Sequence, residues 1–272
     1  MSSAPVLGFF LDPERFMQSF DTREPFGHPS RPSPALLSAV YVWGIALSKS
    51  PDLAVHEPVF LSRTLHYTAL APTSAHPNRA KHALQAEVLL ANYYFYRGLV
   101  SEGRTHCNAA IRIALVHRAH KLAGVVQISG DLGAVEQREW VNAFWMANYM
   151  DLCWTVGTGF PSICPDFRSG DDRVDIPWPI DSTQFRKVKF FTFQILICRP
   201  SFFTIVGLIT KQATQIQDIG KSPLTCLFEN PAASFCEDEE PSFIAMECKA
   251  AILLYRAYKF ATEERTRRLH RS

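Results

Sequence analysis

Histidine, cysteine and aspartate are the residue types whose spacing in this chain could support chemistry. His117 and His120 are three residues apart, so a helix would place both on one face, and the pair His106-Cys107 precedes them. Imidazole and thiolate groups gathered in this way can bind Zn²⁺. The same spacing is common among surface and capping histidines, and we favour that interpretation over a zinc site.

The cysteines form neither a zinc pattern nor a disulfide pattern. The chain has seven of them, an odd number, and no Cys-x-x-Cys pair occurs. Scattered cysteines are usually small buried hydrophobic residues in a reducing compartment. We therefore expect no metal ion and no other cofactor in this chain.

Asp151 is unusual because it lies within the apolar face of a predicted helix. A buried carboxylate needs a cationic or hydrogen-bonding partner. We expect a structural ion pair, with Arg138 or another basic residue, rather than a catalytic acid, since no second carboxylate is nearby in sequence. The turn Gly157-Thr158-Gly159 follows a helix instead of a strand, which excludes a dinucleotide fingerprint. Because the chain also lacks a nucleophile elbow, a phosphate loop and a zinc-protease motif, we predict that it is not an enzyme.

Helices must position these residues, and the sequence predicts an all-α fold, an irregular multi-helix bundle with antiparallel helical hairpins. The chain is 47% hydrophobic, which is enough for a substantial core. In Asp12-Pro13 and in Ser33-Pro34, a capping side chain precedes a proline at the first helical position. Further helices are expected to begin near Glu57 and near Ser242.

Residues 80–122 are predicted to form a helical hairpin, because apolar residues recur at helical spacing on both sides of a short break at residues 97–100. Ser101 is expected to cap the second helix, and residues 124–134 are expected to form a loop. Five polar residues are expected on the solvent-facing sides of the two helices: Lys81, Gln85, Arg104, Asn108 and Arg112.

A third strong helix is predicted over residues 136–156, with Gly157 and Gly159 at its end and Pro161 preventing its continuation. Residues 175–179, DIPWP, must be extended, because proline disfavours helix in the preceding residue. The aromatic residues of this region are expected to belong to the core: Trp140, Phe144, Trp145, Tyr149, Trp154 and Trp178.

Charge and hydropathy say little about partners. The net charge is +2, and the locally basic residues 265–271 are best interpreted as a solvated helix end rather than a nucleic-acid patch. Residues 187–209 are apolar and β-branched, and form the one segment in which a strand is conceivable. Arg199-Pro200 divides them into halves too short for a membrane span, which needs roughly 20 apolar residues. We therefore expect no contact with a membrane.

Three stretches carry a family resemblance: residues 76–121, residues 138–179 and residues 243–261, and the entry segment FFLDPERF adds to them. Together they resemble the fungal-specific transcription factor domain, the regulatory middle region of zinc binuclear-cluster transcription factors. In the first stretch, Arg118-Ala119 replaces the Gly-Leu that is usual in the family. The family signature falls on Arg138, Trp145, Asp151, Gly159, Pro161, Pro177, Trp178 and Pro179.

The resemblance implies a nuclear regulatory domain that takes part in DNA-templated transcription by RNA polymerase II. It divides the chain into a regulatory (middle homology) region at 1–186, an atypical apolar insert at 187–209, and a loop with the C-terminal helix of the same region at 210–272. We know of no counterpart of 187–209 in the family, and we hypothesise that part of this segment is an unspliced intron.

The six-cysteine module with which the family reads DNA is not found in this sequence. We expect the chain to be a fragment, a truncated gene model or a variant without the DNA-binding head. The resemblance therefore implies zinc and DNA contact only through that missing N-terminal module, and no DNA-binding residue in this chain. The partners that it implies are a second copy of the chain or transcription co-regulators, together with a small-molecule effector.

Two other classes of function remain open. The spacing of Ala86, Leu90, Tyr94 and Gly98 resembles one unit of a tetratricopeptide interaction scaffold, but a stable array needs about three repeats. An α-helical enzyme would need a pocket with convergent titratable groups. A repeat-like solenoid would favour the scaffold, whereas a closed bundle with the Gly-Phe-Pro turn packed against the hairpin would favour the regulator.

Overall fold

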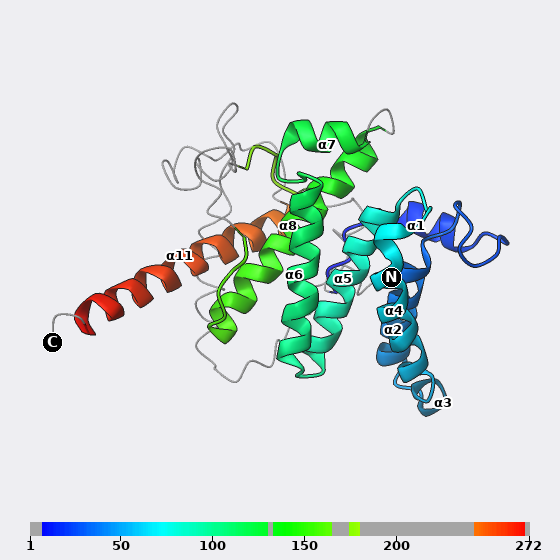
Figure 1. Cartoon of the computed structure of the whole chain (residues 1–272), viewed down its shortest axis with the longest axis horizontal. Coiled ribbons are helices and arrows are strands. Elements are labelled where there is room, and N and C mark those ends of the chain that lie inside the picture. The colour runs from blue at the N-terminus through cyan, green and yellow to red at the C-terminus, as the bar shows by residue number, and fades with distance from the viewer. Residues whose placement is uncertain (1–6, 130–132, 165–173, 180–241, 270–272) are drawn as a thin grey trace.

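The computed structural model describes residues 7–129, 133–164, 174–179 and 242–269. This part of the chain consists of helices and short connections and has no β-strand, so the predicted all-α fold is confirmed (Figure 1). The elements are α1 Pro13–Phe20, α2 Pro34–Ser48, α3 Pro51–Ala54, α4 Glu57–Leu70, the short 3₁₀ helix η1 Ala71–Thr73, α5 Arg79–Tyr96, α6 Val100–Val116, α7 Leu122–Ser129, α8 Ala134–Thr158 and α11 Phe243–Leu269.

Two N-terminal helices begin where the sequence predicts. Asp12 caps α1 by accepting a hydrogen bond from the Arg15 backbone N–H at 3.1 Å. Ser33 caps α2 by accepting one from the Leu36 N–H at 3.4 Å. Each cap precedes a proline whose missing N–H would have no partner in the first helical turn in any case.

The antiparallel pair α5 and α6 forms the centre of the bundle (Figure 1). Helix α2 packs against α5 on one side, where the indole Nε1 of Trp43 donates to the Leu89 carbonyl at 2.9 Å. Helix α8 packs on the other side, and α11 packs on α8. A Cβ on Gly103 would lie 2.4 Å from the Phe95 ring, so only glycine allows α5 and α6 to approach this closely near their turn.

Surrounding helices leave α5 without a solvent-facing side, and α8 packs on α6. Of the five polar residues expected on the solvent-facing sides of this helix pair, three are buried instead, so the expectation is wrong for them. Lys81, Gln85 and Arg104 are buried, Asn108 is half-buried, and only Arg112 is exposed. Burial of a charged or amide group is costly unless it is hydrogen-bonded or paired. These side chains must therefore have partners, and the partners define the site described below.

Other local expectations also need correction. Helix α6 begins at Val100 with Leu99 as its N-cap, so Ser101 is not the cap. Residues 122–129 form α7 rather than a loop, because fully buried Val125 and the packing of α7 on α8 outweigh the low helix propensity of a glycine. Helix α8 continues through Gly157, and Gly159 alone ends it.

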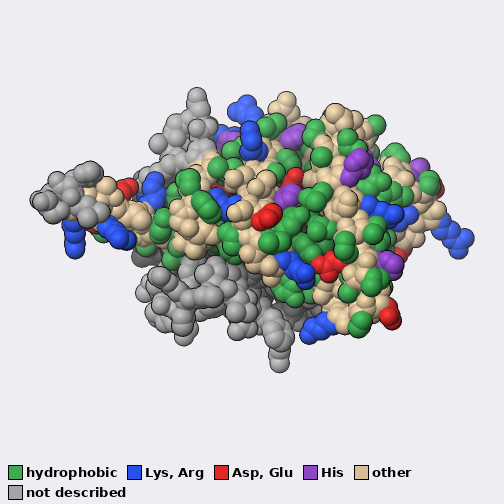
Figure 2. All heavy atoms as spheres, turned by 60° about the horizontal axis from the view of Figure 1, so that its bottom comes forward, with side chains coloured by type: hydrophobic (Ala, Val, Ile, Leu, Met, Phe, Trp, Pro, Cys, Tyr) green, Lys and Arg blue, Asp and Glu red, His purple; other side chains and the backbone are tan. Residues whose placement is uncertain are grey.

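Helix α11 begins as predicted after Ser242, whose hydroxyl accepts a hydrogen bond from the Ala245 N–H at 3.2 Å. Its first half packs on α8, and its second half projects away from the bundle (Figure 1). Lys and Arg side chains lie along this projecting half, where Phe260 is also exposed (Figure 2). The basic residues within 265–268 are thus a solvated helix end, as expected, whereas residues 270 and 271 lie outside the described part.

Within the described ranges, every helix is too short or too polar to span a bilayer. The segment 187–209, and with it the hypothesis of an unspliced intron, lies outside the described residues. The division of the chain into the three predicted segments therefore remains a prediction.

Candidate functional site

Asp151 is fully buried on α8 and forms the expected structural ion pair. Its partner is Arg104 rather than Arg138. Arg104 of α6 places Nη1 3.0 Å from Asp151 Oδ1, an ion pair without the alignment of a hydrogen bond. The same guanidinium donates to the Asp151 carbonyl at 3.3 Å and to the Pro161 carbonyl at 3.0 Å. The Ser162 hydroxyl donates to the other carboxylate oxygen. Arg104 therefore ties α6, α8 and the Gly-Phe-Pro turn together.

Gly159 makes this turn possible by ending α8 in the left-handed conformation, with φ at +77°. Its N–H donates to the Thr155 carbonyl at 2.9 Å, which satisfies one of the last carbonyls of the helix. Pro161 then sends the chain back toward Arg104. The sequence prediction that glycine terminates this helix is confirmed for Gly159.

Gly159→Ala is expected to lower the free energy of unfolding by about 1–2 kcal/mol, the cost of a left-handed backbone for a residue with a Cβ. Only the Tyr258 hydroxyl, at 3.9 Å, would lie near that Cβ, so the loss is conformational rather than steric. Urea denaturation measures it. Gly44→Ala is the matched control in the exposed interior of α2, with no atom within 4 Å, and should instead stabilise by about 0.5–1 kcal/mol. Equal changes in both variants would contradict this reading of Gly159.

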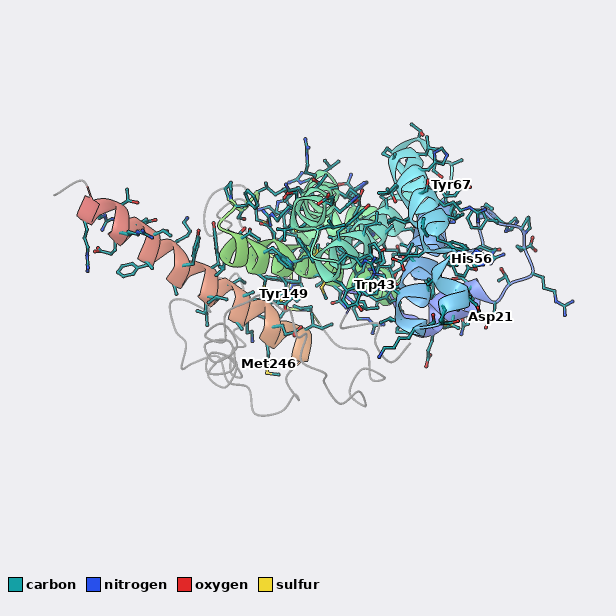
Figure 3. All side chains as sticks on the ribbon, turned by 90° about the horizontal axis from the view of Figure 1, so that it is seen from below. Asp21, Trp43, His56, Tyr67, Tyr149 and Met246 are labelled. Atoms are coloured by element: carbon teal, nitrogen blue, oxygen red, sulfur yellow. The ribbon has the colours of Figure 1, made fainter. Side chains whose placement is uncertain are left out.

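The PWP segment, residues 177–179, is attached to α8 through Trp145. The fully buried Trp145 donates from Nε1 to the Pro177 carbonyl at 2.7 Å, and its ring stacks on Trp178 at a centroid distance of 4.4 Å. Lys249 of α11 places its Nζ 5.2 Å from the Trp178 ring centroid. This segment therefore lies against both α8 and α11, whose crossing is marked by Tyr149 in Figure 3.

Burial lowers the pKa of Lys249 to about 8, from roughly 10.4 in an unfolded chain. Between these values the unfolded state binds more protons, so this lysine makes stability rise with pH; below pH 8 its full penalty is present. We expect the free energy of unfolding of the wild type, relative to Lys249→Met, to rise by up to about 1.4 kcal/mol per pH unit from pH 8 to pH 10. A urea-melt difference that stays constant from pH 7 to pH 10 would contradict the lowered pKa.

A second polar network joins the N-terminal segment to α5 and α8. We call it the N-terminal ion cluster, and its members are Asp12, Arg15, Lys81, Glu136, Arg138 and Glu139. Lys81 Nζ lies 2.5 Å from Glu136 Oε1 and also pairs with Glu139. Arg15 Nη1 lies 2.9 Å from Glu136 Oε2, and Arg138 Nη2 lies 2.9 Å from Asp12 Oδ2. Three cations thus face three carboxylates, and Arg138 serves this cluster rather than Asp151.

Two amide side chains of α5 bind the backbone of the entry segment. Gln85 accepts from the Phe10 N–H at 2.8 Å and donates to the Gly8 carbonyl at 3.0 Å. Asn92 donates to the Leu7 carbonyl at 2.9 Å. The segment has no helical or strand partner at these groups, so buried amides supply the hydrogen bonds that its backbone requires.

Comparison with protein-family models decides the family. The model for the fungal specific transcription factor domain matches residues 9–209. This chain belongs to the fungal-specific transcription factor domain family. No curated protein and no solved structure matches the chain. The predicted resemblance is therefore confirmed at the level of the domain, which is a transcription factor regulatory domain and not an enzyme family.

The signature residues of this fungal transcription factor domain do not form one site. Asp151 and Pro161 both contact Arg104, and Gly159 forms the turn between them. Trp145 and Pro177 are joined at the PWP segment, where Pro179 is buried. Arg138 lies near the opposite end of α8, roughly 30 Å from Gly159 at 1.5 Å per residue. The signature residues therefore lie at three separate places: the turn after α8, the contact of α8 with the PWP segment, and the N-terminal ion cluster.

Sequence reasoning missed the partners that hold this domain together: Arg104, Lys81, Glu136, Glu139 and Gln85. A signal of burial existed for three of them. Lys81 precedes the buried Leu84 by three residues, and Arg104 precedes the buried Cys107 by three, so each lies in register with an apolar stripe. Gln85 also precedes a buried residue, Val88, by three. Periodicity alone does not name the partner of such a residue.

The titratable side chains of the described part bear on metal binding and on the protonation of the thiols. No group of three His, Cys, Asp or Glu residues there could hold a metal ion, so the histidine spacing does not form a described zinc site. Burial raises the pKa of the Cys153 thiol to about 12 and that of the Cys107 thiol as well, which favours the protonated form of both thiols at neutral pH. The aromatic residues Trp140, Phe144, Trp145 and Trp154 are buried in the core, as expected, whereas Tyr149 and Trp178 are partly buried.

Proposed function

We propose that this chain is the regulatory domain of a zinc-cluster transcription factor that acts in the nucleus on transcription by RNA polymerase II. DNA and zinc are contacted through a six-cysteine module outside this sequence. The observation that carries the proposal is the closed bundle in which Arg104 binds the Gly-Phe-Pro turn to the central helical hairpin. A domain of this kind changes activity by exposing or hiding partner surfaces, and co-regulators or a second copy of the chain are the partners proposed.

A reporter assay tests this function. The chain is fused to the DNA-binding head of an unrelated transcription factor, and reporter output is compared with that of the head alone at equal protein levels. We expect the fused chain to change the output, and the variant Arg104→Met, which we expect to be strongly destabilised, to return it toward the level of the head alone. An output that the fused wild-type chain does not change would overturn the proposal.

Purified chain should show no sequence-selective DNA binding by itself. A basic, groove-reading element is needed for such binding, and the basic residues of the described helix end are few and solvated. Electrophoretic mobility shift with a randomised duplex pool measures this directly. A nanomolar, sequence-selective complex would contradict the assignment of DNA reading to another module.

A tetratricopeptide scaffold receives less support. Such an array repeats helix pairs of equal length, whereas the described pair α5 and α6 is followed by the short α7 and then by α8, which has 25 residues. The single repeat-like spacing therefore reflects one helical hairpin inside a closed bundle.

A further inference from the structure

A cavity of about 170 Å³ opens beside the N-terminal ion cluster. Its walls come from α1, from the loop at residues 29–31, from the start of α5 and from α8. Drug-sized ligands occupy cavities of roughly 300–1,000 Å³, so this one suits a ligand of a few heavy atoms. Its lining is mostly polar, which excludes a purely apolar occupant.

Positive charge is in excess at this cavity. Arg15, Arg31 and Lys81 line it, against the two carboxylates Asp12 and Glu139. Arg15 and Lys81 are themselves paired with Glu136 and Glu139, and Asp12 is paired with Arg138, so the excess positive charge is that of Arg31. Among the described residues no carboxylate pairs with Arg31, whose Nη1 donates only to the Glu24 carbonyl.

Two hydrogen-bond donors at the cavity have no described acceptor. The Nε of Arg31 is buried without a partner. His82 is 9% exposed, and its Nδ1 accepts from the Ser33 N–H at 3.1 Å, so its proton resides on Nε2, for which the described residues supply no acceptor. Burial lowers the pKa of His82 well below its usual value, with the neighbouring His76 as the next cause, so the ring is a neutral donor. The Nε of Arg31 is a buried donor left unsatisfied, which is unfavourable, and an acceptor within its reach would remove that cost.

The amino end of α5 reinforces this preference for an acceptor. Its N-cap, Asn78, lines the cavity and makes no side-chain cap bond. The first N–H groups of an α-helix point outward and carry the positive end of the helix dipole, which favours anions. The loop opposite is held in place because the His76 ring donates from Nε2 to the Arg31 carbonyl at 2.9 Å.

From this combination we propose that the cavity between α1, the 29–31 loop and the start of α5 binds a small oxyanion, a carboxylate or a phosphate group. Arg31 and His82 donate to its oxygens, and the amino end of α5 stabilises its charge. The role of this cavity as an effector site rests on the proposed regulatory function. The binding of an anion to the cavity does not depend on that function.

Isothermal titration calorimetry on the purified full chain tests whether the cavity binds an anion. Sodium phosphate and sodium malonate are titrated separately at constant ionic strength maintained with sodium chloride, so that the two arms distinguish a phosphate from a carboxylate ligand. We expect saturable binding of one molecule per chain in at least one arm. Arg31→Gln should weaken it at least about tenfold, since it removes a charge-assisted donor. The matched variant Arg112→Gln, at an exposed arginine of α6, should leave it within about twofold, as surface substitutions away from a site usually do.

The outcomes separate the site from the function. Absence of saturable binding in both arms overturns the site, as does an Arg31→Gln variant that binds as tightly as the wild type. An equal loss in Arg31→Gln and Arg112→Gln also overturns it, because that result reports surface charge alone. The reporter assay above does not depend on any of these results, so a failed site leaves the proposed function standing, and a failed reporter leaves the anion site standing.

Discussion

Arg104→Met is expected to reduce the free energy of unfolding by about 3–5 kcal/mol, because it leaves the carboxylate of Asp151 buried without its cation. Asp151 is fully buried, so solvent cannot take over the role of the guanidinium. The variant also removes the donor to the Pro161 carbonyl and so releases the Gly-Phe-Pro turn from α6. Urea denaturation followed by circular dichroism measures the loss.

Two further variants make this result interpretable. Arg104→Gln combined with Asp151→Asn replaces the charges by neutral amides and should recover more than half of the lost stability, even if the single variant does not fold. Arg267→Met is the matched control, since its partner Glu264 and the arginine are both exposed, and its effect should stay within about 0.5 kcal/mol. A single variant as stable as this control would show that Arg104 does not compensate Asp151.

Lys81→Met should be comparably severe, with a loss of about 3–5 kcal/mol. Lys81 is the one cation that contacts both Glu136 and Glu139 from within the described core, where all three side chains are at most 5% exposed. Arg15 remains beside Glu136, but Glu139 then keeps only a 3.7 Å approach from Arg15 and the N–H of Asp12. The repulsion between the two carboxylates is no longer balanced.

Removal of all the charge is the decisive control for the N-terminal ion cluster. Lys81→Met with Glu136→Gln and Glu139→Gln should be clearly more stable than Lys81→Met alone in the same denaturation assay. Lys259→Met, at an exposed lysine of α11, should be close to the wild type. If the triple variant were as unstable as the single one, lost packing of the lysine stem rather than charge would explain the effect.

Local signals in the sequence were sufficient for most of the fold. Asp12 and Ser33 identify helix starts because their side-chain chemistry acts within one turn, and Gly159 identifies a helix end because its backbone preference is local. Helix α7 was missed, because its formation depends on the burial of Val125 against α8 and so on tertiary contact. The order of residues in the chain does not by itself predict such a tertiary contact.

The difference between local signals and tertiary contacts also explains why the sequence did not reveal the partners at the candidate site. Asp151 was recognised as needing a partner, since its own apolar helical face reveals the burial. The partner could not be named, because Arg104 is 47 residues away and its distance in space depends on how α6 and α8 pack. Lys81 and Gln85 were placed in solvent because a helix that is covered on all sides has no face that amphipathic patterning can reveal.

The Arg104–Asp151 pair also has a consequence for how this sequence can diverge. Loss of either charge alone passes through an intermediate that carries an uncompensated buried ion, whereas loss of both restores a viable core. We therefore expect descendants of this gene to keep the two residues together or to exchange them together. An alignment of related sequences in which position 104 loses its charge while Asp151 is kept would contradict this expectation.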